Sequence, residues 1–224
     1  MNELLCVCIL MISLIVIYIT RKYSNKLGLM IVYITSSILS FILTFKLVTI
    51  STLNFNSNAI IYVTMFTSLY LLLDKHSKKE VSSIINFGFI MNIFCAIMLY
   101  LMSYYIQSLT DTVGINMKNV FINNSRILIV YPITILISQQ LLTVVYDKIK
   151  NLYDNIFIST VTTYLAVGLI EALLYTFITY LNILEPTLII KLLLSTYMTR
   201  LIITVIYSLF LTITDKKKVT KWVT

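Results

Sequence analysis

The chain is short of the residues that break helices and of those that carry most enzyme chemistry. Its 224 residues include 4 glycines, 2 prolines and 1 histidine, His76. Because glycine and proline interrupt helices, their scarcity predicts long unbroken helices and argues against a transporter with long unwound segments. A lone histidine in the polar stretch DKHSKKE does not make a catalytic site. We therefore expect no catalytic residue and no enzyme activity.

Charged residues are scarce as well. They make up 12% of the chain against 59% hydrophobic residues, and the mean hydropathy is +0.93. An ordinary soluble domain is about a quarter charged, so this composition excludes that class and indicates a polytopic membrane protein. The net charge of +8 comes mostly from loops that set membrane topology, so we expect a lipid bilayer and no nucleic acid as partner.

Cysteine is sparse, and no pattern of metal ligands occurs. Cys6, Cys8 and Cys95 lie in apolar runs, are odd in number and lack zinc-site spacing. We interpret them as small packing residues. The sequence also lacks a glycine-rich phosphate loop and a paired-carboxylate motif, so it predicts no metal and no cofactor.

What the sequence has in abundance is apolar runs long enough to cross a membrane. A crossing helix needs about 20 such residues. The runs lie at about 4–20, 27–46, 59–73, 81–106, 127–145, 156–182 and 188–213. The fold class predicted is all-α, a transmembrane bundle of six to seven helices in which residues 1–224 form one integral-membrane domain. The first run could be a signal peptide, but it has no basic start and no Ala-x-Ala site, which favours a span.

Lysine and arginine alternate between the two sides of the predicted bundle. The tail and the loops on one side hold 12 of these residues, the other side holds 4, and Arg200 lies inside the last run. Basic residues concentrate in cytoplasmic loops. We therefore predict an N-terminus outside and a C-terminus in the cytoplasm, for a multi-pass protein of the cell inner (plasma) membrane.

Glu171 lies in the middle of an apolar helix. A carboxylate at membrane depth faces the bundle interior or a water-filled cavity. Tyr164, Gly168 and Tyr175 share its helical face at spacings of three and four residues. Gly168 leaves room beside the carboxylate, either for a flat ring or for close packing of another helix.

Arg200 is the second charge at membrane depth. Thr196 and Thr204 flank it at intervals of four residues and complete a polar stripe. Glu171 and Arg200 could pair as a structural ion bridge, or one or both could bind substrate, or Glu171 could relay a proton. The sequence leaves these alternatives open, because the contact depends on helix rotation.

Two neighbouring glutamines follow Ser138 in the stretch ILISQQLLTVV. Gln139 and Gln140 project about 100° apart on a helix. We expect Gln139 to face a central polar cavity shared with Glu171, and Gln140 to tie its helix to a neighbour. Amides suit a planar heterocycle with donor and acceptor edges, although hydrogen bonding between helices is the alternative.

Five blocks of the chain resemble, in their order and spacing, the VUT family of bacterial queuosine-precursor transporters. They are LTFKLVTI (43–50), YLLLDKHSKKEV (70–81), RILIVYPITILISQQLLTVVYDKIK (126–150), TTYLAVGLIEALLYTFITYL (162–181) and LIIKLLLSTYMTRLIITVIY (188–207). The resemblance covers about residues 35–210 and leaves the run 4–20 as an additional N-terminal helix. The chain departs from the family pattern at Phe45, Tyr70, Leu142, Gly168, Met198 and Arg200.

The resemblance implies an importer of a small planar solute, a queuosine precursor (a 7-deazapurine base) or a related nucleobase. The positions that carry over are Lys46, Asp74, Arg126, Ser138, Gln139, Glu171 and Lys191. Together with the residues at membrane depth they give the candidate substrate-binding set of Glu171, Gln139, Arg200, Tyr164, Gly168, Ser138, Lys46, Arg126 and Asp74. In this hypothesis Glu171 and Gln139 read the hydrogen-bonding edge, and aromatic residues such as Tyr164 cover the ring.

Other readings stay open at this point. The chain could be the substrate-binding subunit of an energy-coupling-factor transporter, which would need coupling subunits, or it could form a homo-oligomer. A structural or accessory membrane protein is a third class, in which the buried polar residues only pack. A membrane enzyme needs a nucleophile–base pair or clustered acids and histidines, and the lone deep acid argues against it.

Overall fold

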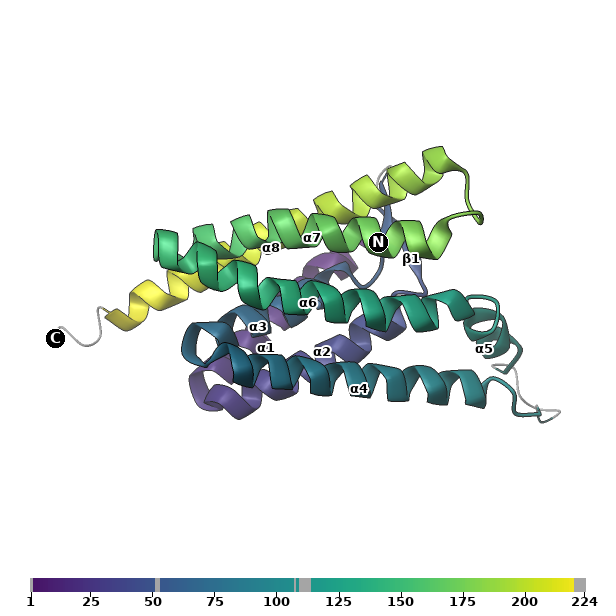
Figure 1. The fold of residues 1–224 in the computed structure, drawn as a ribbon, viewed down its shortest axis with the longest axis horizontal. Helices are drawn as coiled ribbons and strands as arrows, with labels where there is room; N and C mark the ends of the chain where they lie inside the picture. The colour runs from purple at the N-terminus through teal and green to yellow at the C-terminus, as the bar shows by residue number, and fades with distance from the viewer. Residues whose placement is uncertain (1, 51–52, 107, 109–113, 220–224) are drawn as a thin grey trace.

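Long helices dominate the computed structural model, which describes residues 2–50, 53–106, 108 and 114–219. They lie side by side as a bundle, with a small hairpin of two strands against it (Figure 1). The elements are α1 (Asn2–Tyr23), α2 (Asn25–Leu43), β1 (Leu47–Ile50), β2 (Leu53–Asn56), α3 (Ala59–Lys75), α4 (Lys78–Met102), α5 (Gly114–Phe121), α6 (Ser125–Tyr153), α7 (Ile156–Tyr180) and α8 (Pro186–Val219). The predicted all-α bundle is confirmed.

Six helices of the described chain are long and apolar enough to cross a membrane. They are α1, α2, α4, α6, α7 and α8. The seventh predicted run, 59–73, forms α3, which has 17 residues. At 1.5 Å per residue α3 is about 26 Å long, slightly less than the hydrocarbon thickness of a bilayer. The prediction of six to seven spanning helices is therefore confirmed, with α3 at the lower limit of length.

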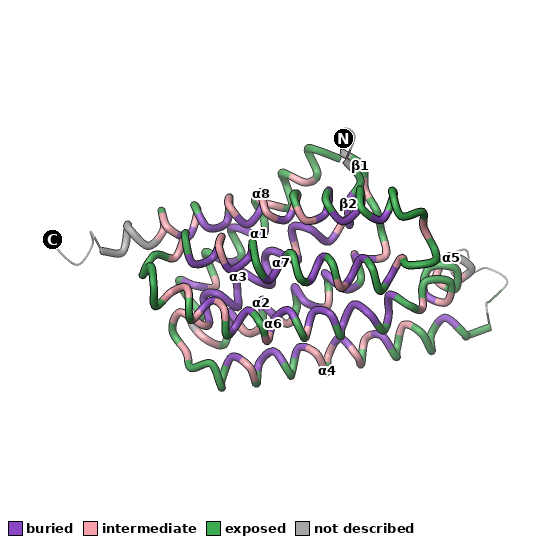
Figure 2. Tube along the Cα trace, turned by 45° about the horizontal axis from the view of Figure 1, so that its top comes forward, coloured by how far each residue is buried: buried purple, intermediate pink, exposed green. Residues whose placement is uncertain are grey.

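Helix α3 is the core of the bundle. Every residue from Tyr62 to Leu72 is buried, and α3 packs against α1, α2, α4, α6 and α8. A helix that is apolar on all sides is stable only when other helices surround it. By contrast, α4 at the lower edge of Figure 2 turns exposed residues outward along its length. Its outward side chains, which include Phe87, Ile90 and Phe94, are apolar, as a lipid-facing surface requires.

The hairpin of β1 and β2 was not predicted. Its strands are antiparallel, with Leu47 opposite Asn56 and Ile50 opposite Leu53, and it contacts α1 and α8. The predicted run 27–46 ends just before the stretch LVTI that forms β1, whereas α2 ends at Leu43. We call the end of the bundle that carries this hairpin the hairpin end.

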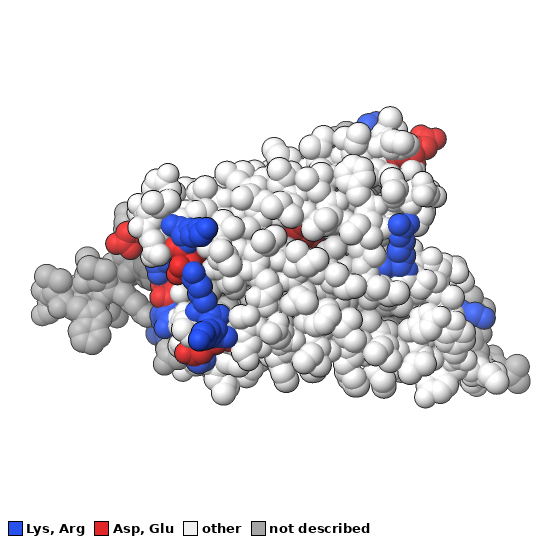
Figure 3. Space-filling view, viewed as in Figure 1, with Lys and Arg blue, Asp and Glu red and all other residues white. Residues whose placement is uncertain are grey.

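Charged side chains gather at the opposite end, which we call the charged end. There Lys78 lies 2.8 Å from Asp147, Lys150 pairs with Asp74, and Lys26 pairs with Glu80. These pairs join α2, α3, α4 and α6. Figure 3 shows the corresponding cluster of blue and red at the left, beside a central surface that is white except for a small red patch.

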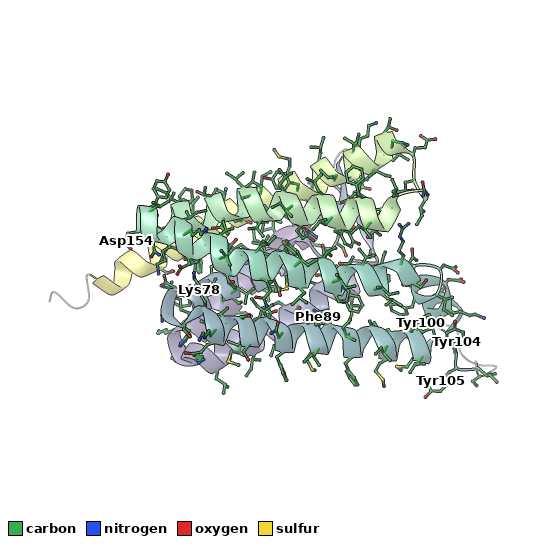
Figure 4. All side chains as sticks on the ribbon, viewed as in Figure 1. Lys78, Phe89, Tyr100, Tyr104, Tyr105 and Asp154 are labelled. Carbon is green, nitrogen blue, oxygen red and sulfur yellow. The ribbon has the colours of Figure 1, made fainter. Side chains whose placement is uncertain are left out.

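The side chains drawn in Figure 4 show the same division along α4. Lys78 lies at the charged end, Phe89 in the middle, and Tyr100 and Tyr104 at the far end. The hydroxyl groups of these two tyrosines are 2.9 Å apart and exposed. Tyrosine is enriched where a helix leaves the hydrocarbon core, so α4 has the pattern of a complete membrane crossing.

Candidate functional site

The two deep charges form an ion pair between neighbouring helices. The Nη1 atom of Arg200 on α8 donates to Oε2 of Glu171 on α7 at 2.7 Å. Their side chains are only 1% and 0% exposed. Removing two charges from water is expensive, and their attraction offsets that cost only when the geometry is good and the remaining hydrogen-bonding groups are satisfied. The contact that the sequence left open is thus present.

Arg200 also contacts Asn58, at the N-cap position of α3, and Tyr62 on α3. Its Nη2 atom donates to Oδ1 of Asn58 at 3.3 Å, and its guanidinium carbon lies 3.7 Å from the ring centre of Tyr62. A cation over an aromatic face is attracted to it, most strongly where water is excluded. The guanidinium plane is therefore fixed between Glu171, Asn58 and an aromatic ring.

Asn58 also connects this site to α2. Its Nδ2 atom donates to Oγ1 of Thr44 at 2.5 Å and to the carbonyl oxygen of Ser40 at 3.3 Å. Sequence reasoning missed Asn58, because an asparagine just before an apolar run is typical of a helix cap. Here it occupies the N-cap position of α3, but its side chain makes no capping bond. It contacts Arg200 instead.

Several buried polar atoms near the ion pair have no hydrogen-bond partner within the described part of the chain. They include Oε1 of Glu171, Nε of Arg200 and Oγ1 of Thr196, and further along α7 the hydroxyl groups of Tyr164, Thr163 and Ser159. Buried polar groups are almost always paired, and each exception calls for an explanation such as a ligand or a water molecule. Donors and acceptors that point into the bundle are what a polar substrate would need.

Gly168 makes room for a ring, as the sequence suggested, but the ring belongs to its own helix. A Cβ atom at Gly168 would lie 2.7 Å from ring carbons of Tyr164. The Tyr164 ring in turn stacks on Tyr197 of α8, with centres 5.9 Å apart and planes 11° apart. Gly168 thus allows Tyr164 to lie flat between α7 and α8. Tyr164 lies on α7 with Glu171, and Tyr197 lies on α8 with Arg200.

The two glutamines play different parts. Gln139 is buried: its Oε1 accepts from the hydroxyl of Tyr33 at 2.7 Å, and its Nε2 lies 3.2 Å from the sulfur of Met65. Gln139 therefore joins α6 to α2 and α3, and the cavity that it was expected to share with Glu171 stays a prediction. Gln140 accepts from Ser82 and donates to Asn86 at 3.0 Å. This confirms that Gln140 ties its helix to a neighbour, α4.

Three other candidates, Ser138, Arg126 and Lys46, do not join the ion pair. The Ser138 hydroxyl donates to the carbonyl of Ile135 within α6 at 3.0 Å. Arg126 donates to the carbonyl of Leu181 at 2.9 Å, between the start of α6 and the end of α7, and Lys46 is exposed beside the hairpin.

Asp74 lies at the other end of the bundle. It is 16 residues along α3 from Asn58, about 24 Å at 1.5 Å per residue. One small ligand cannot reach both. Of the candidate residues, the structure brings together Glu171 and Arg200, with Tyr164 and Gly168 beside them on α7.

The described residues contain no group of three or more histidine, cysteine or acidic side chains that could hold a metal ion. Cys6, Cys8 and Cys95 are free thiols, two of them partly buried and Cys8 exposed. The chemistry of the site therefore rests on an ion pair, hydroxyl groups and aromatic rings.

Comparison with known families gives one match. Residues 56–214 match the family described as "Putative vitamin uptake transporter". This range covers well over half of the chain, and it includes α3 to α7 and most of α8. The chain belongs to this family of multi-pass membrane transporters, which confirms the resemblance drawn from the sequence blocks. No curated protein and no solved structure matches the chain.

Proposed function

We propose that this member of the vitamin uptake transporter family imports a small planar heterocycle, a 7-deazapurine base that serves as a queuosine precursor or a related nucleobase. The family supports uptake of a small organic molecule. The observation that carries the finer proposal is the buried Glu171–Arg200 pair, in which Oε1 of Glu171 and Nε of Arg200 have no hydrogen-bond partner among the described residues.

The groups around the pair suit a flat, polar ring. Oε1 of Glu171 can accept from a ring N–H or an exocyclic amine, and Nε of Arg200 can donate to a carbonyl oxygen or a ring nitrogen. Tyr164 and Tyr197 supply stacked aromatic faces between the same two helices. Heterocycles bind by stacking on such faces and by hydrogen bonds to their edges. Glu171 and Arg200 read the edge in this mechanism, and the tyrosines cover the face.

Import requires the site to open alternately to the two sides. In transporters whose site lies near the bilayer midplane, one group of helices rocks against the other around the bound solute. Here Asn58, which follows the hairpin, contacts Arg200, and the ion pairs of the charged end join α2, α3, α4 and α6 at the other end of the bundle. In the proposed orientation the charged end faces the cytoplasm, because basic residues concentrate on that side of a membrane.

The test is rescue of tRNA modification. The chain is expressed in a strain that cannot make queuosine precursors and lacks its own importer, deazapurine bases are supplied at low concentration, and queuosine in tRNA is measured. We expect the wild-type chain to restore modification. We expect both variants to abolish it: Glu171→Gln removes the carboxylate charge that pairs with Arg200, and Arg200→Gln removes the guanidinium with its Nε donor.

A matched control is Glu185→Gln, the same chemical change at an exposed position before α8. It should restore modification as the wild type does. The amount of each variant in the membrane is measured by immunoblot, so that loss of uptake is separated from loss of protein. If Glu171→Gln and Arg200→Gln both transport at the wild-type rate, the proposed site is wrong. If the wild type is in the membrane and restores nothing, the proposed substrate is wrong.

A further inference from the structure

A hollow lies on the outside of the bundle at the hairpin end. Its volume is about 590 Å³, a size common among small-molecule sites. The walls come from the hairpin, from the connection between α7 and α8, and from α8. The lining residues are Leu47, Asn54, Leu184, Leu188, Lys191, Leu192, Leu194, Ser195 and Met198. None of the residues proposed to bind the transported solute is among them.

The lining residues follow one side of α8 from its start towards the middle of the membrane. Leu188, Leu192 and Ser195 recur at spacings of three and four, so they share a helical face. At 1.5 Å per residue, Met198 lies about 18 Å along α8 from Pro186. One leaflet of the hydrocarbon core is about 15 Å deep. The hollow therefore has the depth of a single leaflet and runs along the direction of a lipid tail.

Lys191 is the one basic residue of the lining. It lies about 7.5 Å along α8 from Pro186, so its long side chain can reach the headgroup region. It forms no ion pair within the described part of the chain, whereas Lys26, Lys78 and Lys150 at the charged end all have acidic partners. An unpaired cation above an apolar hollow is complementary to an anionic headgroup above an acyl chain.

We propose that this hollow binds one anionic phospholipid of the leaflet at the hairpin end. Its headgroup, which has a net negative charge that a zwitterionic headgroup lacks, pairs with Lys191, and an acyl chain lies against Leu188, Leu194 and Met198. These three apolar side chains are about half exposed, at 47%, 53% and 49%, so the protein leaves them for another molecule to cover. Lipid surrounds any membrane protein, but a hollow with walls on two elements and one cation holds a particular lipid in place.

The lipid has a structural consequence for the hairpin. Leu47 and Asn54 on the hairpin form one wall, and α8 forms the other. The two walls are joined by the Ser195 hydroxyl, which donates to the carbonyl oxygen of Asn54. A lipid that contacts both walls adds to this hydrogen bond. Bound anionic lipid should therefore raise the thermal stability of the protein more than a zwitterionic lipid with the same tails.

The experiment measures lipid retention on the purified protein. The protein in mild detergent is supplied with equal amounts of phosphatidylglycerol and phosphatidylcholine that carry identical acyl chains, and native mass spectrometry counts the lipids that stay bound. We expect the wild type to retain more phosphatidylglycerol. Lys191→Gln should lower its retention about fivefold relative to phosphatidylcholine, which corresponds to about 1 kcal/mol for one basic residue near a charged headgroup.

Two further variants make the result specific. Lys118→Gln removes an exposed lysine from α5, which lies at the same end through contact of Phe121 with Phe45, and it should leave the retention ratio unchanged. Met198→Trp fills the deep part of the hollow and should lower retention of both lipids. The proposal is overturned if Lys191→Gln keeps the wild-type ratio, if Lys118→Gln lowers the ratio equally, or if Met198→Trp retains both lipids.

Discussion

The bundle contains ion pairs in two environments that differ in their exposure to solvent. At the charged end the paired side chains of Asp74, Lys150, Lys78 and Asp147 are 21–47% exposed. In the middle of the bundle the side chains of Glu171 and Arg200 are 0% and 1% exposed. The first set can exchange its partners for water at little cost. The second has only the partners that the fold provides.

Membrane topology accounts for the charges at the charged end but not for the buried pair. The lysines of the charged end satisfy the requirement for basic residues on one side of the membrane, and nearby acids pair with them at little gain. No topological rule asks for Glu171 or Arg200. A buried pair is often no more stable than apolar residues of the same volume. Its presence, with Oε1 and Nε lacking a hydrogen-bond partner among the described residues, is the observation on which the proposed solute site rests.

The largest effect on stability should come from breaking the central pair. Glu171→Gln leaves the Arg200 charge buried without its acid, and removing one partner of a buried pair costs about 3–5 kcal/mol. We expect a large drop in the free energy of unfolding, measured in detergent by chemical denaturation. The double variant Glu171→Gln/Arg200→Met removes both charges and should recover most of that stability while it stays inactive in uptake.

The double variant decides how this result is understood. If the double variant is as unstable as Glu171→Gln alone, an uncompensated Arg200 charge is not what destabilises the single variant. That result would contradict the explanation that burial makes the central pair costly to break. Glu185→Gln is the control for the chemical change itself, because Glu185 is exposed. It should unfold at the same denaturant concentration as the wild type.

A smaller effect is expected from the glycine beside the ion pair. The added methyl group of Gly168→Ala would meet the Tyr164 ring at 2.7 Å and would have to displace it from its stack on Tyr197. Overpacking of this kind costs about 1–3 kcal/mol. The same denaturation experiment should show this loss, and Gly168→Ala/Tyr164→Leu should recover part of it, because the smaller side chain clears the space. Equal stability of Gly168→Ala and the wild type would contradict the tight contact.

The spans and the deep polar residues were predictable from sequence, whereas the contacts between them were not. Apolar runs of fixed length define crossings, because the bilayer thickness sets the length of a helix. The depth of Glu171 and Arg200 follows from counting residues within those runs. Whether the two side chains meet depends on the rotation and tilt of α7 and α8, which packing decides and no periodicity encodes.

The hairpin and the role of Asn58 were not predicted, and both for the same physical reason. The hairpin of β1 and β2 has strands of only 4 residues and lies between the predicted runs 27–46 and 59–73, where hydropathy predicts no helix and the strands are too short to give a signal of their own. Asn58 has the sequence position of a helix cap and the structural role of a partner to Arg200. In both cases tertiary contact decides what the local sequence does not show.

The smallest effect should come from the charged end. Asp74→Asn removes the acid that pairs with Lys150, and such partly exposed pairs contribute about 0.2–1 kcal/mol. We expect a loss within that range, and it should shrink as salt rises because ions screen exposed charges. The loss in Glu171→Gln should change little over the same range of salt, since both side chains of that pair are buried and dissolved ions screen buried pairs much less. If Asp74→Asn were as damaging as Glu171→Gln, or equally insensitive to salt, the charged end would be part of the stable core, and exposure would not be what distinguishes the two environments.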